Sequence, residues 1–305
     1  MQTILGSNGQ IGQELAKELN KRYTKDIRLV SRNPKRVNQQ DQLLSANLLD
    51  FDETNQAVLG SEIVYFTAGL PMDSERWEKE FPLMMENVIK ACKINQSKLV
   101  FFDNTYMYDK TSQAQTEESP FVPRGKKSLV RAQMAQMLLD ELTLGELKAV
   151  ICRAPEFYGP GKTQSITNTM IFDKLKAGKK ARIPVSAHTS RTLIWTPDAS
   201  RAMALIGNSP DAYGQTWHLP CADSITYQAL MEEIQKVTGI QPEYTVIPMW
   251  QFRLGRFFSK SIKELQELLP RYQVDNLFVS DKFKKRFPEF KVTSFEEGIQ
   301  QILGS

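Results

Sequence analysis

Residues 3–12 read Thr3-Ile-Leu-Gly6-Ser-Asn-Gly9-Gln-Ile-Gly12, an apolar run that passes directly into three glycines spaced three residues apart. Ile11, Leu15 and Leu19 then follow at the spacing of one helix face. Glycines let a backbone turn sharply and approach a pyrophosphate, whose charge would lie at the positive end of the helix. The same spacing also fits a plain connection between strand and helix. The strand before the glycines and the helix after them favour a dinucleotide-binding turn.

The first half of the chain repeats this alternation of short apolar runs and amphipathic stretches. The runs that we expect to be strands lie at 3–5, 27–30, 63–66, 99–102 and 149–152. They are nearly continuous in apolar residues, as expected for parallel strands covered by helices on both faces. Helical spacing is found over 11–22, 77–92 and 129–142. The pattern predicts an α/β fold with a Rossmann-like doubly wound parallel sheet.

After Arg153 the sequence contains more prolines and glycines, which indicates that the helices and strands of this part are shorter. We expect a dinucleotide-binding Rossmann domain over 1–160 and a mainly substrate-binding, smaller C-terminal portion over 161–305, with segments near 190–222 returning to the first domain. Further helices are predicted from Thr196, over 226–238 and over 294–303. In the last of these, Ser294 and Glu297 have the spacing of a capping box.

Composition excludes several classes of function. The chain has 305 residues and a net charge of +4, too weak a basic excess to indicate a nucleic-acid partner. Three cysteines and two histidines argue against a disulfide scaffold and against multi-histidine metal sites. No apolar run approaches the roughly 18–20 residues that span a bilayer, and the first predicted strand leaves no room for a signal peptide. We therefore expect a cytoplasmic protein with no metal, membrane or nucleic-acid partner.

Three motifs together resemble a known family. They are the G-x-x-G-x-x-G run at 6–12, Thr67-Ala68-Gly69 at the end of a later strand, and Tyr158-Gly-Pro-Gly161 after Arg153. Together they resemble the extended short-chain dehydrogenase/reductase family, in its NAD-dependent epimerase/dehydratase branch. The likeness covers essentially the whole chain, including the segment 191–198. It implies a Rossmann domain that binds NAD(P) and a smaller C-terminal domain that binds the substrate, often a nucleotide sugar.

The expected cofactor site lies at the glycine turn and at the ends of the next strands. Its predicted residues are Gly6, Asn8, Gly9, Gln10, Ile11, Gly12, Ser31, Arg32, Asn47, Leu48, Thr67, Ala68 and Gly69. An NAD enzyme would offer an acidic residue to the ribose at the end of the second strand, where this chain has Ser31 and Arg32. Arg32, with Lys35 and Arg36 nearby, would instead suit the 2′-phosphate of NADP. NADP is therefore predicted over NAD. The alternative is that these basic residues belong to a solvent-exposed loop that binds no phosphate. Asn47 stands where the family usually has an Asp near the adenine.

The family's acid/base pair, a tyrosine followed four residues later by a lysine, is absent from this chain. In that pair the lysine stabilises the phenolate, since a phenol with a pKa of about 10 is otherwise a poor base. The segment 123–131 contains no tyrosine, and Asn104 stands at the family's serine position. The chain thus resembles a subgroup that lacks the pair. Either another group carries the proton, or the protein is a catalytically silent NADP-binding regulator or sensor.

The candidate catalytic residues are Asn104, Thr105, Tyr106 and Lys126, and among these the tyrosine and the lysine are candidates to carry the proton. Tyr106 would point to the same side as Asn104 if the strand continued that far, although plain packing is the simpler interpretation. Lys126 and its neighbour Lys127 lie where a helix is expected to begin, and a solvated helix end explains them equally well.

Two carboxylates lie near the expected cleft. They are Asp103 and Glu156, and either would be an acid/base if desolvation raised its pKa. Ion pairing with Arg131 or Arg153 is the simpler account of both.

Tyr158 and Arg191 are the predicted substrate-binding residues. Arg191 stands where nucleotide-sugar members of the family bind a diphosphate, and Lys162 and Lys179 add positive charge. An ordinary arginine at a strand end is the alternative. The sequence thus predicts an NAD(P)-dependent oxidoreductase or epimerase/dehydratase-like enzyme acting on a small, anionic or nucleotide-sugar substrate.

Methionines gather in two of the predicted helices, at positions 84, 85, 134 and 137. They fit the interface of a homodimer, and core packing explains them as well.

Overall fold

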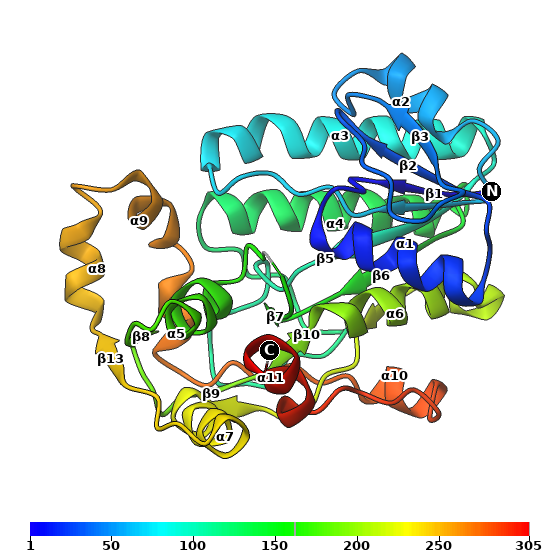
Figure 1. Ribbon diagram of the computed structural model, residues 1–305. Helices are drawn as coiled ribbons and strands as arrows, with labels where there is room; N and C mark the ends of the chain where they lie inside the picture. Colours follow the sequence, from blue (N-terminus) through cyan, green and yellow to red (C-terminus); the bar gives the residue numbers. More distant parts are fainter. Residues whose placement is uncertain (162, 305) are drawn as a thin grey trace. The chain divides into compact units, whose positions relative to one another are not determined.

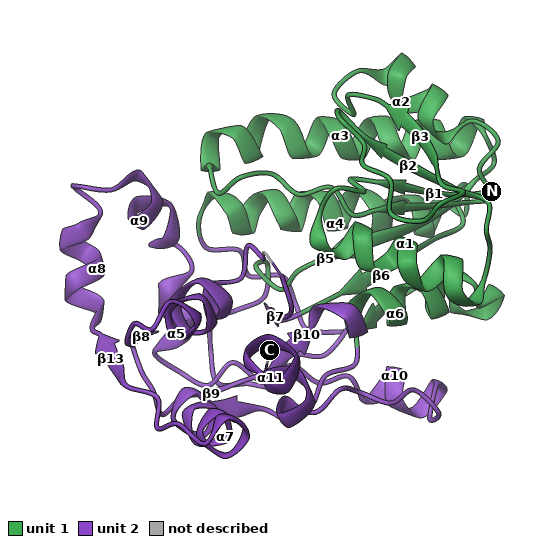
Figure 2. Ribbon diagram, in the orientation of Figure 1, with its two compact units in different colours: residues 1–107, 125–154, 199–219 green, residues 108–124, 155–198, 220–305 purple. Residues whose placement is uncertain are grey.

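The computed structural model describes residues 1–161 and 163–304, which form two compact units (Figure 2). Unit 1 comprises residues 1–107, 125–154 and 199–219, and unit 2 comprises 108–124, 155–198 and 220–305. Residues 108–124 and 155–160 belong to unit 2, whereas a boundary at 160 would have assigned them to the first domain. Of the later segments, 199–219 returns to unit 1.

Unit 1 is built on a seven-stranded sheet of order β11-β6-β5-β4-β1-β2-β3, in which every neighbouring pair is parallel. Its strands are β1 (Gln2–Leu5), β2 (Ile27–Ser31), β3 (Gln42–Ser45), β4 (Ile63–Phe66), β5 (Lys98–Asp103), β6 (Ala149–Arg153) and β11 (Thr216–His218). In the central pairs, Leu5 lies opposite Val30 of β2 and Phe66 of β4. The glycine turn after β1 therefore lies at the same carboxyl edge as the ends of β2 and β4.

Helices cover both faces of this sheet (Figure 1). They are α1 (Gln10–Arg22), α2 (Phe51–Val58), α3 (Ser74–Ile94), α4 (Lys126–Leu144) and α6 (Thr196–Gly207), with a 3₁₀ turn η2 (Pro210–Ala212). Helices α2, α3 and α4 pack side by side, and Ser200 Oγ of α6 donates to the Ile11 carbonyl of α1 at 3.0 Å. Strands β1, β4 and β6 are buried along their whole length, as their continuous apolar sequences predict.

The five predicted strands are all present, and the sheet has two additional ones at its edges, β11 and β3. The sequence of β3, Gln-Leu-Leu-Ser, has no apolar run and lies mostly exposed. The predicted Rossmann-like fold is confirmed. The predicted helix over 77–92 is longer at its start, because Asp73 caps the first turn by accepting from the Arg76 amide.

Unit 2 consists of three two-stranded sheets and short helices. The strand pairs are β7 (Glu156–Tyr158) with β10 (Leu193–Trp195), β9 (Ser190–Arg191) with β12 (Ile225–Thr226), and β8 (Ala181–Pro184) with β13 (Tyr244–Ile247). The helices are α5 (Asp173–Lys176), α7 (Tyr227–Thr238), α8 (Met249–Gly255), α9 (Lys260–Leu265), α10 (Asp281–Arg286) and α11 (Phe295–Leu303), with a π-helical turn η1 (Asn168–Phe172) and a 3₁₀ turn η3 (Leu269–Tyr272).

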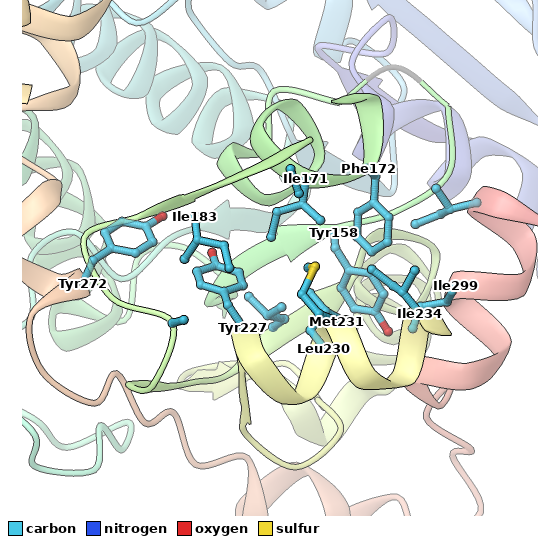
Figure 3. Packing of buried hydrophobic residues seen from close by; sticks show 14 of the residues in the cluster. Tyr158, Ile171, Phe172, Ile183, Tyr227, Leu230, Met231, Ile234, Tyr272 and Ile299 are labelled. Carbon is cyan, nitrogen blue, oxygen red and sulfur yellow. The ribbon is translucent and has the colours of Figure 1, made fainter. Parts of the chain in front are cut away.

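The core of unit 2 gathers side chains from β7, η1, α7 and α11 (Figure 3). Tyr158 lies in its middle, with the Phe172 ring 6.3 Å away and the Trp195 ring 5.1 Å away. A Cβ on Gly298 of α11 would lie 2.9 Å from Tyr158 Cε2, so a glycine is needed where α11 crosses this ring. The predicted capping box of Ser294 and Glu297 is confirmed at the start of the same helix.

Candidate functional site

The glycine turn is folded so tightly that two of its glycines have no room for a side chain. Gly6 has a φ of +88°, and a Cβ on it would lie 2.4 Å from the Ala68 Cα. A Cβ on Gly12 would lie 2.9 Å from the Gly6 carbonyl oxygen. The Gly6 amide donates to the Val30 carbonyl at 2.9 Å, which fixes the turn to the end of β2. The predicted residue Gly6 thus lies directly against two others, Ala68 and Gly12.

Helix α1 begins directly after the glycine turn, with an exposed glycine at its N-cap. The N-cap residue is Gly9, which has no side chain to cap the helix, and Gln10 begins the helix, whose first turn contains no acidic residue. Gly69, at the end of β4, has nothing within 4 Å of where a Cβ would stand. An N-terminus with this geometry attracts negative charge through its amides and its dipole.

The end of β2 offers one buried hydroxyl and one exposed cation. Ser31 Oγ is buried and has no hydrogen-bond partner among residues 1–161 and 163–304. Arg32 is exposed, whereas Arg36 donates to the carbonyls of Gln39 and Asp41 at 2.9 and 2.6 Å. Of the predicted basic group, Arg36 is therefore already committed to its own loop.

The predicted cofactor residues Asn8 and Thr67 join neighbouring segments of unit 1. Asn8 Oδ1 accepts from the Lys35 amide at 3.0 Å, which links the glycine turn to the loop after β2. Thr67 Oγ1 donates to the Leu5 carbonyl at 3.0 Å and so joins the ends of β4 and β1.

The remaining predicted cofactor residues precede α2. Asn47 is half-buried, with its amide donating to Glu53 Oε2 at 2.6 Å, and Leu48 is buried with its carbonyl accepting from Asn87 Nδ2 at 2.9 Å. The predicted cofactor residues lie in the turn after β1 and the start of α1, at the end of β2, and in the segments that follow β2, β3 and β4.

The segment after β5 does not continue the strand, which was the condition for Tyr106 and Asn104 to point to the same side. Strand β5 ends at Asp103, because Asn104 Oδ1 accepts from the Tyr106 amide at 2.9 Å and turns the backbone. Tyr106 then stacks on Trp77 of α3, with ring centroids 6.1 Å apart and planes 8° apart. Thr105, between them, is buried. Alternation along a strand therefore does not apply to these residues.

The two lysines at the start of α4 have opposite environments. Lys126 is exposed and forms an ion pair with Glu78 at 2.7 Å. Lys127 is 1% exposed, and its Nζ donates to Ser74 Oγ, at the start of α3, at 2.6 Å. The interpretation as a solvent-exposed helix end is therefore correct for Lys126 and wrong for Lys127. Nothing in the sequence distinguishes two adjacent lysines, and only the register of α4 decides which one is buried.

Asp103 is fully buried between two arginines of unit 1. Its Oδ1 accepts from Arg131 Nε and Nη2 at 3.0 and 2.5 Å, and its Oδ2 accepts from Arg153 Nε at 3.0 Å. The simpler interpretation of Asp103, ion pairing with Arg131 and Arg153, is confirmed. These contacts join β5, β6 and α4.

Glu156 is the centre of a second buried cluster, in unit 2, with partners other than the predicted ones. It forms ion pairs with Arg191 and, at 3.4 Å, with Arg271, and it accepts from Tyr272 Oη at 3.0 Å and Asn276 Nδ2 at 3.2 Å. Burial disfavours the charged carboxylate, but Arg191 and Arg271 outweigh it and lower the pKa of Glu156 to about 2. Its charge is therefore held in the folded protein.

The predicted substrate residues of unit 2 are both buried. Arg191 is fully buried against Glu156 and also donates to the Arg271 carbonyl at 3.0 Å, so a buried carboxylate already takes the place expected for a substrate diphosphate. Tyr158 is enclosed by the core, and burial raises the pKa of its hydroxyl. This placement does not support substrate contact by either side chain. Lys179 is exposed, and Lys162 lies outside the described residues.

The sequence also led to expectations about the methionines, membrane-spanning helices and metal sites. Met84, Met85 and Met134 are buried within unit 1, where they pack as core residues. No helix in the described part of the chain is long and apolar enough to cross a membrane. Among the described residues, no group of three or more His, Cys, Asp or Glu side chains is placed to hold a metal ion.

Comparison with known proteins defines the class of this chain. The family model described as the NAD dependent epimerase/dehydratase family matches residues 3–219. This match spans more than half of the chain, which therefore belongs to that family, as the motifs had indicated. No curated protein matches the sequence.

Solved structures share the fold at low sequence identity. The structure of gox2253 has a TM-score of 0.82 at 18% identity, over 100% of this chain and 97% of its own. UDP-glucose 4-epimerase of Thermus thermophilus, solved with NAD, has a TM-score of 0.78 at 16% identity, over 100% and 98%. UDP-glucuronic acid 4-epimerase of Bacillus cereus, also solved with NAD, has 0.78 at 14%, over 99% and 97%. These likenesses establish the fold.

Proposed function

We propose that this protein is an NAD(P)-dependent oxidoreductase or epimerase/dehydratase-like enzyme that acts on a small anionic substrate of the nucleotide-sugar class. The observation that carries the proposal is the turn between β1 and α1. It packs against Ala68 without room for side chains and presents an uncapped helix N-terminus with no acidic residue in its first turn. This is the geometry in which a helix binds the pyrophosphate of a dinucleotide.

The described residues fit a nicotinamide dinucleotide. The amides at the start of α1 would hold the pyrophosphate, and Asn47 and Leu48 would border the adenine. The buried Ser31 hydroxyl, which has no partner among the described residues, and the exposed Arg32 would hold a phosphate on the adenosine ribose. No acidic side chain stands at these two positions, so NADP is proposed over NAD. The bound cofactor would supply the acceptor or donor of hydride.

The substrate class rests on the family and on what its structural relatives bind. One relative is a UDP-glucose 4-epimerase, and others were solved with UDP-glucose or UDP-glucuronic acid. Asn104, Thr105 and Tyr106, which follow β5 at the carboxyl edge of the sheet, are proposed to contact the substrate. Lys126 was a further candidate, but its exposure and its ion pair with Glu78 favour it least.

Cofactor binding is the first experiment. Titration of the intrinsic or cofactor fluorescence with NADPH and NADH should show tighter binding of NADPH. Arg32→Ala should lower the affinity for NADPH by about 10-fold or more, because a charge-assisted hydrogen bond to the phosphate is lost. It should lower the affinity for NADH by less than about 2-fold. Arg22→Ala, another exposed arginine of unit 1, is the matched control. Equal effects on both cofactors would overturn the assignment of the 2′-phosphate.

Turnover is the second experiment. UDP-glucose and UDP-glucuronic acid are incubated with the protein and NADP⁺ or NAD⁺, absorbance at 340 nm reports reduced cofactor, and proton NMR reports a change at a sugar carbon. Phenanthrenequinone with NADPH tests reduction of a carbonyl. Tight cofactor binding without any turnover on these probes would favour the silent binding protein. Absence of cofactor binding would contradict both functions.

A further inference from the structure

Large apolar side chains are exposed in the segment 248–263 of unit 2, which comprises α8, α9 and the turn between them and lies at one margin of that unit (Figure 2). Phe257 and Phe258, in the turn, are 70% and 89% exposed, and Trp250 of α8 is 59% exposed. Leu254, also exposed, follows Trp250 by four residues on the same side of α8. Exposed apolar surface of this kind marks a site of interaction with a partner or a membrane.

Other side chains of the same segment anchor it in the core of unit 2. Phe252 of α8 is buried in that core, and Ile262 of α9 packs against it. A Cβ on Gly255 would lie 2.9 Å from Ile262 Cδ1, so the two helices are in close contact. Gln266 Nε2 donates to the Phe252 carbonyl at 2.7 Å and holds α8 to the chain after α9. The exposed aromatic side chains therefore belong to a folded, anchored element.

The exposed side chains of this segment also carry positive charge. Residues 244–263 contain no acidic residue and four basic ones, all exposed: Arg253, Arg256, Lys260 and Lys263. Arg253, Arg256 and Lys263 form no ion pair within residues 1–161 and 163–304. The Arg256 guanidinium lies over the Phe257 ring, 4.8 Å from its centroid, so a cation and an aromatic ring occupy the same surface.

We propose that the segment 248–263 binds the surface of membranes that contain anionic lipids. Tryptophan and phenylalanine side chains enter the boundary between head groups and acyl chains, and arginine and lysine beside them attract the lipid phosphates. A membrane partner was not expected from the sequence, because no apolar run is long enough to span a bilayer. A segment that lies on the surface needs no such run. The proposal does not rest on the cofactor or the reaction proposed above.

The charge of the segment favours a lipid surface over a second copy of this chain. In a twofold interface the same patch faces itself, so the four basic side chains would meet four others, with no acidic residue of 244–263 between them. The buried centre of a protein interface is also depleted in charged residues, lysine included. Here Arg253 lies between Trp250 and Leu254 in the sequence, and Arg256 covers Phe257. An anionic lipid surface accommodates both the rings and the cations.

Trp250 supplies a signal for the first test, which uses the full-length protein. The other three tryptophans, Trp77, Trp195 and Trp217, are buried, so a change in emission on adding vesicles is assigned to Trp250 by its loss in Trp250→Phe. With mixed vesicles of phosphatidylcholine and phosphatidylglycerol, the emission should shift to shorter wavelength and be quenched by brominated acyl chains. Vesicles of phosphatidylcholine alone should bind at least about 10-fold more weakly, and added salt should weaken binding to the mixed vesicles.

Flotation of the protein with the same vesicles gives a second measure of binding. Failure of the wild-type protein to float with the mixed vesicles, with unchanged emission, would overturn the proposal. Equal binding to both kinds of vesicle would also overturn it, because the basic side chains would then have no part in binding.

The second test changes the charges and the rings separately. Arg253→Gln combined with Arg256→Gln should lower partition onto the mixed vesicles by about 10-fold or more. Phe257→Ser combined with Phe258→Ser should lower it by about 10-fold or more as well. All four side chains are exposed, so circular dichroism of both variants should match the wild type.

Two control variants match these changes elsewhere in the chain. Lys284→Gln combined with Lys285→Gln removes the same charge from α10 of unit 2, and Leu144→Ser removes an exposed apolar side chain from unit 1. Both should leave partition within about 2-fold of the wild type. An equal loss in the controls would reveal non-specific attraction and contradict the proposal.

Light scattering on a sizing column, without vesicles, tests the second copy as the occupant. If the wild-type protein does not float and the change at Phe257 and Phe258 dissociates an oligomer, the segment is an interface between copies of this chain and the proposal is wrong.

Discussion

Each unit of this protein contains a buried carboxylate between two arginines, and the two clusters are built differently. In unit 1, Asp103 and Arg153 are register partners on the adjacent strands β5 and β6, and Arg131 comes from the helix that follows β5. In unit 2, Glu156 pairs with Arg191 and Arg271, which lie far along the chain in a two-residue strand and a 3₁₀ turn. The Asp103 cluster lies on a continuous parallel sheet. The Glu156 cluster connects short segments that have few backbone hydrogen bonds to one another.

This difference teaches what each cluster contributes. The backbone ladder between β5 and β6 would hold Asp103 and Arg153 together even without their ion pair. Around Glu156, strands of two or three residues make few ladder bonds, and Tyr272 and Asn276 add side-chain bonds to the same carboxylate. We therefore expect side chains to determine the geometry of unit 2 to a greater extent than that of unit 1.

The largest effect is expected from Glu156→Gln. The change leaves Arg191 and Arg271 buried without an opposite charge, which should lower the free energy of unfolding by about 3–5 kcal/mol. Urea denaturation followed by circular dichroism measures it. Glu243→Gln, which removes an exposed ion pair with Lys180 in the same unit, is the control and should leave the free energy of unfolding almost unchanged. A loss below about 1 kcal/mol for Glu156→Gln would show that the cluster does not hold unit 2 together.

Asp103→Asn should cost less, about 3 kcal/mol, because the sheet still positions Arg153 and the asparagine still accepts hydrogen bonds. Its effect should be concentrated in α4, where Arg131 loses the negative charge that pairs with its guanidinium. Hydrogen exchange read by mass spectrometry should show faster exchange in the first turns of α4 and little change in β1 or β4. An Asp103→Asn effect larger than that of Glu156→Gln would reverse the comparison.

At low pH the Glu156 cluster should lose its contribution to the free energy of unfolding, because the carboxylate becomes protonated. The folded pKa of about 2 is below the ordinary value of 4.5, so the carboxylate contributes stability above pH 4.5 and loses it as the pH falls toward 2. Between pH 6 and pH 3 this group should account for a loss of about 2 kcal/mol. The difference in unfolding free energy between the wild type and Glu156→Gln should shrink by that amount. A constant difference over this range would contradict the lowered pKa.

Local signals predicted unit 1 well. Apolar runs and glycines act between neighbouring residues, so the strands, the turn at Gly6 and helix α1 follow from short stretches of sequence. The edge strand β3 was missed because it lacks an apolar run. Tyr106 and Asn104 would share a side only if β5 continued to them, and the strand ends at Asp103, followed by a turn in which the Tyr106 amide donates to Asn104 Oδ1.

Side-chain partners that are far apart along the chain could not be predicted from the sequence. Arg191 has its carboxylate 35 residues earlier, and Tyr272 and Asn276 reach the same carboxylate from 116 and 120 residues later. No spacing rule connects such positions, so the motif likeness of Arg191 suggested a substrate contact instead. The burial of Lys127 likewise depends on how α4 rotates against α3, which adjacent lysines do not reveal.

The division of unit 1 into three stretches of chain has a consequence for the order in which the protein assembles. Strand β11 pairs with β6, yet it is synthesised only after the segment 155–198 of unit 2. Until then, β6 presents an open hydrogen-bonding edge of the kind that invites pairing with another chain. A fragment cut at residue 160 would keep that edge permanently, and would retain 108–124 without the unit on which this segment folds. The nucleotide-binding half of this protein is therefore complete only when more than two-thirds of the chain has been synthesised.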